Sequence, residues 1–208
     1  MDAFKNIKED LSSVIKKALK CKIIQNPRIG GKFFDNKNLI SSKYSYFRDE
    51  EDYKNSLPRK YEDDEYLFTM IEDSGLFQAN YEFERPAKRK CHLKKMNLCY
   101  LPPVEDGVVL KDYIRIDYHD DNIGFFHSNV HMHVGFLSRI RIPLDEVLLF
   151  SEFFNFILYF HYPDSFKRFN KEMPITHTFS TGSPRMTRNV VLSNELKNFV
   201  YLQTQNRH

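Results

Sequence analysis

The stretch "EYLFTMIEDSGLFQANYEFE", residues 65–84, contains the pattern that decides the fold. Its two halves, 65–72 and 76–84, alternate apolar and polar side chains with the period of two that is typical of half-buried strands. Between them, "DSG" at 73–75 is a turn signal of the kind that closes a hairpin. The stretch therefore predicts two strands that pair antiparallel.

Further strands are expected at short intervals along the chain. The candidates are "RKCHLKKMNLCYLP" at 89–102, "VVLKDYIRIDYH" at 108–119 and "VHMHVGFLSRIRIP" at 130–143. Short connections between successive strands favour an antiparallel meander, because a parallel pair needs a long crossover. We therefore expect one antiparallel sheet of about five to six strands over residues 65–143.

Helical patterns lie on either side of these strands. Residues 3–20 place apolar side chains at helical spacing among Lys and Glu, so an amphipathic helix is expected within 1–22. "LDEVLLFSEFFNFILYFHY" is apolar on most faces and predicts a long buried helix near 144–161. A loop is expected at 163–174, and Ser193 is a suitable N-cap for a short C-terminal helix over 193–203.

Residues 35–60 are rich in Asp, Asn, Lys and Ser, with one short strand candidate, "KYSYFRD" at 43–49. We expect this segment to be irregular and mobile. The chain shows neither an internal repeat nor a clear linker, so residues 1–208 are interpreted as one domain. The expected class is α+β, with helices packed on the antiparallel sheet.

The amino-acid composition excludes few classes of function. The 208 residues are 41% apolar and 28% charged with a net charge of +3, which neither requires nor excludes a nucleic-acid partner. The three cysteines have no metal-ligand spacing and are interpreted as reduced thiols. The start, "MDAFKNIKED", has no signal-peptide pattern, and no apolar run approaches the ~18–20 residues that span a bilayer. We expect a cytoplasmic protein without a membrane partner.

The strongest candidate site lies on two neighbouring strands. Alternate side chains of a strand share a face, so Arg115, Asp117 and His119 are expected on one face of the first strand. His131 and His133 share a face of the second strand. Since the apolar residues between them should face the core helix, both polar sets are predicted on the opposite, exposed or cleft-lining face of the sheet.

Two chemistries suit this set. In metal-free phosphodiester cleavage, His131 and His133 would exchange protons, Asp117 would orient one of them and Arg115 would bind the phosphate. Arg139 or Arg141 would bind the phosphate together with Arg115, and His119 and His127 would be supporting residues.

The second chemistry is binding of a zinc-like divalent metal, for which the expected ligands are His127, His131, His133 and Asp117. A purely structural interpretation also stays open, because H-x-H is a weak motif. A solvated polar face with an Arg115–Asp117 salt bridge would produce the same pattern.

An ordered set of segments within residues 65–165 resembles an uncharacterised bacterial family, domain of unknown function 2290. The set comprises "GLFQANYEFE", "NLCYLPP", "YIRIDYH", "HSNVHMHVG", "RIRIP" and "FHYP". Where the family often has Pro after the first His of the triplet, this chain has Ser128. The resemblance implies a setting near toxin–antitoxin or phage-defence genes, and the Arg-Asp-His layout is also similar to small bacterial toxins that act on RNA.

Three functional hypotheses follow from these patterns. The first is a bacterial toxin or phage-defence protein that cleaves RNA or another nucleic acid. The second is a non-catalytic binding subunit of a defence or toxin–antitoxin complex, whose protein partner is an antitoxin or a defence subunit. The polar segment at 35–60 could become ordered on that partner. The third is a metal-dependent hydrolase that uses the histidine cluster.

Overall fold

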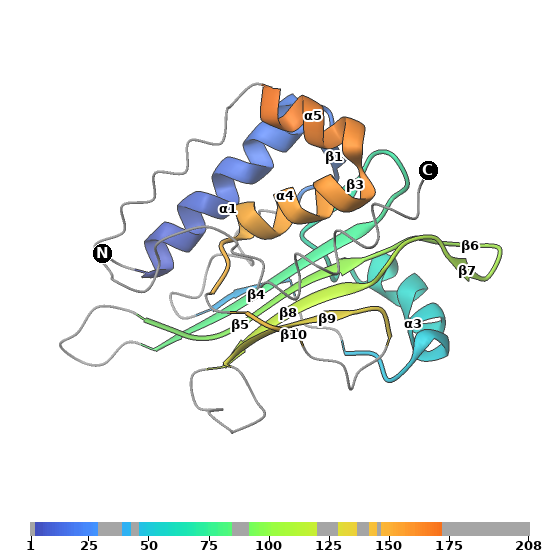
Figure 1. The fold of residues 1–208 in the computed structure, drawn as a ribbon, viewed down its shortest axis with the longest axis horizontal. Helices are drawn as coiled ribbons and strands as arrows, with labels where there is room; N and C mark the ends of the chain where they lie inside the picture. Colours follow the sequence, from blue (N-terminus) through green and yellow to red (C-terminus); the bar gives the residue numbers. More distant parts are fainter. Residues whose placement is uncertain are drawn as a thin grey trace.

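The computed structural model describes residues 3–28, 39–42, 46–84, 92–119, 129–136, 142–144 and 147–171. Within these ranges the chain has an α+β fold in which helices pack on both faces of a mainly antiparallel sheet (Figure 1). The helices are α1 (Ala3–Lys20), α3 (Glu50–Glu62), α4 (Phe150–His161) and α5 (Pro163–Lys171). The strands are β1 (Ile24–Gln25), β2 (Leu39–Ser41), β3 (Phe68–Met70), β4 (Leu76–Glu84), β5 (His92–Leu101), β6 (Val104–Glu105), β7 (Val108–Val109), β8 (Ile114–His119), β9 (Val130–Val134) and β10 (Ile142–Pro143).

The main sheet has eight strands, in the order β1-β3-β4-β5-β8-β9-β10, with β2 also paired to β4. Every pair in it is antiparallel, and β3 and β4 form the hairpin that the 65–84 stretch predicts. The class and the meander are therefore confirmed. The sheet is somewhat larger than five to six strands, because the short strands β1 and β2 come from segments upstream of residue 65.

Helices α1, α4 and α5 lie together above one face of the sheet (Figure 1). The core between them is largely aromatic. The ring centroids of Phe77 and Phe154 lie 5.3 Å apart, and those of Phe68 and Phe154 lie 5.6 Å apart, both in edge-to-face geometry. Such pairs add to the burial of apolar area, which is the main term that stabilises a core. The predicted packing of the N-terminal helix and of a buried Phe-rich helix is confirmed.

Two boundaries in the C-terminal part differ from the prediction. The buried helix expected near 144–161 begins only at Phe150, and Val147–Leu149 are not helical. A further helix, α5, occupies Pro163–Lys171, where a loop was expected. Proline fits the first position of a helix, which needs no N–H donor there, and Phe169 is buried. The helix predicted over 193–203 lies outside the described residues.

The prediction that residues 35–60 are irregular is wrong for most of the part that the structure describes. Helix α3 begins after Asp49, whose side chain accepts a 2.8 Å hydrogen bond from the Asp52 N–H and caps the helix. Tyr53 and Leu57, one turn apart, are its buried residues. The helix was missed because only this narrow stripe is apolar and because Pro58 lies within it. The strand candidate at 43–49 is not a strand over 46–49, and 43–45 lie outside the described residues.

Helix α3 covers part of the second face of the sheet, opposite α1 and α4 (Figure 1). A smaller apolar cluster lies under it, containing Tyr53 and Leu57 of the helix, Cys99 and Leu101 of β5, and Tyr113 just before β8. The Tyr53 hydroxyl donates a hydrogen bond to the Pro102 carbonyl. The sheet therefore has a core on each face.

A search of the described residues finds no helix that is both long and apolar enough to cross a membrane.

Candidate functional site

The pairing of β8 with β9 brings the predicted site residues together. Arg115 lies opposite His133, and Asp117 lies opposite His131. Directly opposite residues of antiparallel strands point to the same face, so all four side chains meet there. The apolar alternates, such as Ile116 and Met132, belong to the core on the other face. The predicted juxtaposition of Arg115, Asp117, His131 and His133 is therefore found in the structure.

The Asp117 carboxylate is the centre of this group. Its Oδ2 accepts a 2.9 Å hydrogen bond from Arg115 Nε. The Nε2 atoms of His133 and His131 lie 3.3 Å and 3.7 Å from the same oxygen. The other oxygen, Oδ1, accepts a 2.6 Å hydrogen bond from the Asn97 side-chain amide. Both oxygens of one carboxylate thus have defined partners on three neighbouring strands.

The two imidazoles are buried beside each other. Their ring centroids lie 4.9 Å apart with planes at 73°. His133 is 3% exposed, and neither of its ring nitrogens has a hydrogen-bonding partner among the described residues. Its Nε2 lies 3.3 Å from Asp117 Oδ2, but this contact does not have the geometry of an aligned hydrogen bond. A buried polar atom without a partner is costly, so His133 marks a position where a further ligand would stabilise the protein.

The expectation of an exposed or cleft-lining surface is wrong for most of this group. Arg115, His131 and His133 are buried, and only Asp117 is partly exposed, with 15% of its side chain accessible. Alternation in a strand specifies the face of the sheet but not how deeply that face is covered.

Burial and neighbouring groups shift the pKa of Asp117 in opposite directions, and the neighbouring groups have the larger effect. Burial raises the pKa of the carboxyl, whereas the close approach of His133, the charge of Arg115 and the hydrogen bond from Asn97 lower it. The net effect is a pKa below its ordinary value of 3.8. Asp117 is therefore a carboxylate at neutral pH, which is the form needed to bind a cation or to orient an imidazole.

Asn97 is a member of the group that sequence reasoning missed. It lies on β5 opposite Asp117 and is 5% exposed. Besides donating to Asp117, its side-chain oxygen lies 3.4 Å from the Asn80 amide nitrogen as an acceptor. The available signal was a single amide in the apolar run "MNLCYL" at 96–101, on the strand face that also carries Cys99.

Tyr46 is the second missed neighbour. The Arg115 guanidinium carbon lies 5.3 Å from the centre of the Tyr46 ring, within the range of a cation–π contact. Tyr46 is 54% exposed, so one part of the ring contacts Arg115 and the rest is accessible. The position fell in the segment expected to be irregular, and no local pattern linked it to β8.

The remaining predicted residues are not part of the group. His119 lies two residues after Asp117 on β8, opposite Lys95. Among the described residues, those whose ligand atoms could share a metal ion are Asp117, His131 and His133, without His119. His127, Arg139 and Arg141 lie outside the described residues.

The arrangement has the chemistry of a metal-ligand set. Asp117, His131 and His133 each offer one ligand atom, and the three atoms lie within 4.8 Å of one another. Two imidazoles and one carboxylate are typical of zinc and iron sites that keep open positions. The same groups could also transfer protons, because a neutral imidazole beside a carboxylate is a competent general base.

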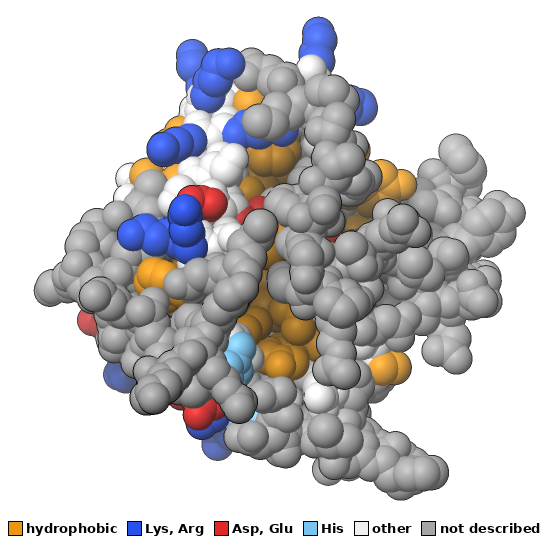
Figure 2. Space-filling view, turned by 90° about the vertical axis from the view of Figure 1, so that its left-hand side faces the viewer, with side chains coloured by type: hydrophobic (Ala, Val, Ile, Leu, Met, Phe, Trp, Pro, Cys, Tyr) orange, Lys and Arg blue, Asp and Glu red, His pale blue; other side chains and the backbone are white. Residues whose placement is uncertain are grey.

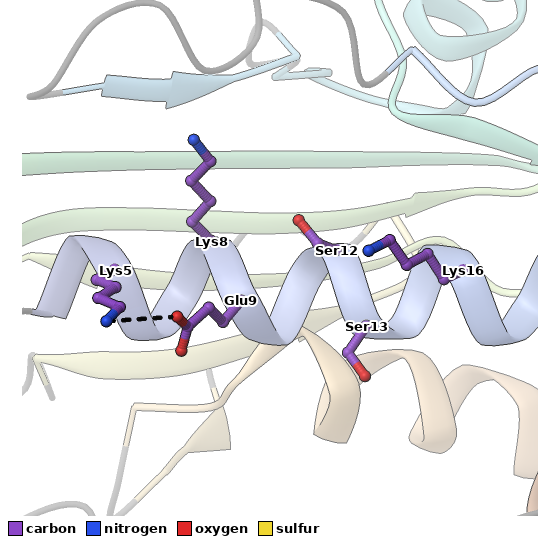
Figure 3. Close-up of a pocket in the computed structure, with 6 residues that line it drawn as sticks. All are labelled: Lys5, Lys8, Glu9, Ser12, Ser13 and Lys16. Carbon is purple, nitrogen blue, oxygen red and sulfur yellow. Dashed lines mark ion pairs between the residues drawn. The ribbon is translucent and has the colours of Figure 1, made fainter.

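A second polar region lies on the solvent-facing side of α1. A surface hollow of about 510 Å³ is lined by Lys5, Lys8, Glu9, Ser12, Ser13 and Lys16. Lys8 extends away from the Lys5–Glu9 ion pair, which spans 3.8 Å (Figure 3). Figure 2 shows that Lys and Arg side chains gather in the upper left part of one face of the molecule. All these lining residues come from one helix, and their side chains do not converge on a common point (Figure 3). We therefore do not treat the hollow as a second candidate active site.

Comparison with known protein families matches residues 32–197 to the family described as "Uncharacterized conserved protein (DUF2290)". The chain belongs to the DUF2290 family. The match extends beyond residues 65–165 in both directions, and it includes α3 as well as the strands that carry the site. Neither the curated proteins nor the solved structures contain a match to the chain. Family membership is thus shown, and the chemistry of this DUF2290 protein has to be argued from its own residues.

Proposed function

We propose that this DUF2290 protein cleaves phosphodiester bonds, with RNA as its substrate, and that Arg115, Asp117, His131 and His133 form its catalytic group. One observation carries the proposal. A guanidinium and two imidazoles converge on a single carboxylate oxygen at 2.9 Å, 3.3 Å and 3.7 Å. Groups that bind phosphate, move protons and fix an imidazole are the components that such a reaction needs.

Two routes of cleavage are open to these residues. In the metal-free route, one imidazole takes the proton of a ribose 2′-OH as its oxygen bonds to phosphorus. The bond from phosphorus to the 5′ oxygen then breaks, and the second imidazole gives that oxygen a proton. In the metal-dependent route, the carboxylate and imidazoles hold an ion that activates a water. In either route Arg115 offsets the charge that develops on the phosphate.

The proposed setting is a bacterial toxin or phage-defence protein of the cytoplasm. This part of the proposal rests on the resemblance of the chain to its family and to small RNA-directed toxins. In the metal-free route, the histidine and arginine chemistry is compatible with an RNA substrate, because RNA supplies its own 2′-OH nucleophile.

The test is a cleavage assay on the purified full-length chain. A labelled single-stranded RNA and the DNA of the same sequence are incubated with the native protein, with His131→Ala and with His133→Ala. We expect cleavage of the RNA, reduced by about 10²–10⁴-fold in each variant. His92→Ala is the matched control, since His92 is half-exposed and paired with Glu84 on another part of the sheet. Equal activity in folded His131→Ala and His133→Ala, or none in the native chain, would defeat the proposal.

A non-catalytic subunit is the second candidate, because one surface suits a protein partner. Tyr159 on α4 is 54% exposed, and its ring lies 5.4 Å from that of Phe160 and 5.3 Å from that of Phe166. Exposed aromatic clusters are enriched in protein interfaces. If a partner co-purifies with the native chain and with His133→Ala but not with Tyr159→Ser, the binding function is favoured.

A further inference from the structure

We propose that Asp117, His131 and His133 bind one divalent transition-metal ion, with zinc as the best fit. The inference deepens the proposed function, but it rests on that proposal only for what the ion does. Whether the ion binds can be measured without any assay of cleavage. Their ligand atoms come from facing positions of two paired strands, so the sheet itself fixes their spacing.

The distances suit such an ion. In a tetrahedral shell with zinc about 2.0–2.1 Å from each nitrogen or oxygen, neighbouring ligand atoms are about 3.3 Å apart. His133 Nε2 and His131 Nε2 lie 3.3 Å and 3.7 Å from Asp117 Oδ2, and the three ligand atoms lie within 4.8 Å of one another.

His133 provides an independent observation that points to a ligand. It is 3% exposed, and both its ring nitrogens lack hydrogen-bonding partners among the described residues. Burying an unsatisfied polar group is costly, and coordination of Nε2 would remove that cost for one of the two nitrogens. A purely structural core histidine would be expected to have at least one hydrogen bond instead.

The surrounding residues hold the carboxylate in the form a metal requires. Asn97 donates to Oδ1 at 2.6 Å, and Arg115 donates to Oδ2 at 2.9 Å, which fixes the plane of the carboxylate. An ionised carboxylate oxygen has two lone-pair sites, so Oδ2 can accept from Arg115 and still face the imidazoles. Partners of this kind orient ligands in metal sites, and losing one weakens binding about 10–100-fold.

The inference decides between the two routes of cleavage. With both imidazoles as ligands, the nucleophile becomes a metal-bound water. It releases a proton to solvent, its oxygen bonds to phosphorus, and the bond to the leaving oxygen breaks as that oxygen takes a proton from water. His131 and His133 then hold the ion rather than exchange protons, and Arg115 is the group left to bind the phosphate.

Metal binding is tested by titrating the chelator-treated full-length chain with Zn²⁺ and with Co²⁺, using calorimetry and the visible spectrum of Co²⁺. We expect one ion per chain and a loss of at least about 100-fold in affinity in His131→Ala, His133→Ala and Asp117→Ala. His119→Ala is the matched control, because His119 lies on the same strand outside the ligand group. It should bind the ion like the native chain.

X-ray absorption of the metal-loaded native chain covers the case in which a variant fails to fold. Two imidazole ligands support the inference, whereas fewer overturn it, as does native protein that binds no ion. The outcomes separate the two proposals. Metal binding without RNA cleavage defeats the proposed function alone. Native protein that binds no ion defeats the metal site, and cleavage that persists in metal-free protein overturns the part of the ion in the reaction.

Discussion

At the scale of single residues, Asp117 links the stability of the protein to its site. A carboxyl whose pKa is lowered in the folded chain stabilises the fold when it is ionised. That stabilisation is fully present above its ordinary pKa of 3.8 and is lost as the pH falls through the lower pKa of the folded protein. Asp117→Asn removes the charge and leaves Arg115 buried without its carboxylate partner.

We therefore expect Asp117→Asn to be less stable than the native chain at neutral pH, with a difference that shrinks as the pH falls below 3.8. Urea unfolding followed by circular dichroism across this range measures the effect. Asp52→Asn is the control. The pKa of Asp52 is also below its ordinary value, but Asp52 is paired with Arg48 at the surface rather than with a buried guanidinium. A stability difference that does not change with pH would contradict the argument.

Gly75 makes a second prediction at this scale. A Cβ at this position would lie 2.7 Å from the hydroxyl of Tyr162 and 3.1 Å from the ring of Tyr100. That hydroxyl is already bonded to Asp73 at 2.9 Å and to the Tyr100 hydroxyl at 2.6 Å, so it cannot move without losing partners. We expect Gly75→Ala to lower the free energy of unfolding by about 1–3 kcal/mol. Thermal melting checks it, with exposed Glu72→Ala as the control.

Which side chains share the site could be predicted from the sequence, but the environment of the site could not. The period of two placed Arg115 and Asp117 with His131 and His133, because facing strands leave few alternatives. The burial of the site and the contact with the Tyr46 ring depend on which segments cover the sheet. The contact with the Asn97 amide depends on the register between β5 and β8. Local patterns contain neither kind of information.

At the scale of elements, helix α4 is capped by a side chain from another helix. Its N-cap residue, Leu149, has no side chain that can accept a hydrogen bond. Instead, Asp10 of α1 accepts a 3.0 Å bond from the Ser151 N–H, and Glu152 accepts a 2.7 Å bond from the Leu149 N–H. Burial raises the pKa of Asp10 even though the bonds to Ser151 act to lower it. The cap thus also ties α1 to α4.

We expect Asp10→Ala to lower the free energy of unfolding by about 1–2 kcal/mol, because the Ser151 N–H is left without an acceptor. Asp10→Asn keeps an acceptor and should lose less. Chemical denaturation of the three proteins measures both differences. If Asp10→Ala and native protein unfold at the same denaturant concentration, the cap does not contribute.

Helices with many buried apolar residues could be predicted from the sequence, whereas helices with few were missed. Helix α1 was expected because its buried stripe, from Ile7 to Ala18, runs through five residues. Helices α3 and α5 have two buried residues each, and their polar composition resembles that of a loop. The shared cap of α4 lies beyond any local motif, because its two partners are separated by 141 positions.

At the scale of the whole molecule, one sheet supports two cores. Phe154 belongs to the core under α1 and α4, and Leu57 belongs to the smaller core under α3. Both cores pack on the same strands, so neither should persist when the other is lost. The prediction of a single domain, made from the lack of a linker, leads to the same expectation.

We expect Phe154→Ala and Leu57→Ala each to lower the midpoint of one cooperative unfolding transition, at a cost of about 2–5 kcal/mol each. Far-ultraviolet circular dichroism and tyrosine fluorescence should give coincident curves for both variants. A separate early transition in Leu57→Ala would show that α3 and its cluster unfold independently.

The contact between Tyr46 and Arg115 also has a practical consequence. The chain has 12 tyrosines and no tryptophan. Tyr46→Trp would therefore introduce one indole, half-exposed and next to a guanidinium that is bonded to the central carboxylate. Its emission would come from that one position. Binding of ions, nucleotides and oligonucleotides could then be screened optically in microlitre volumes, without an assay of activity.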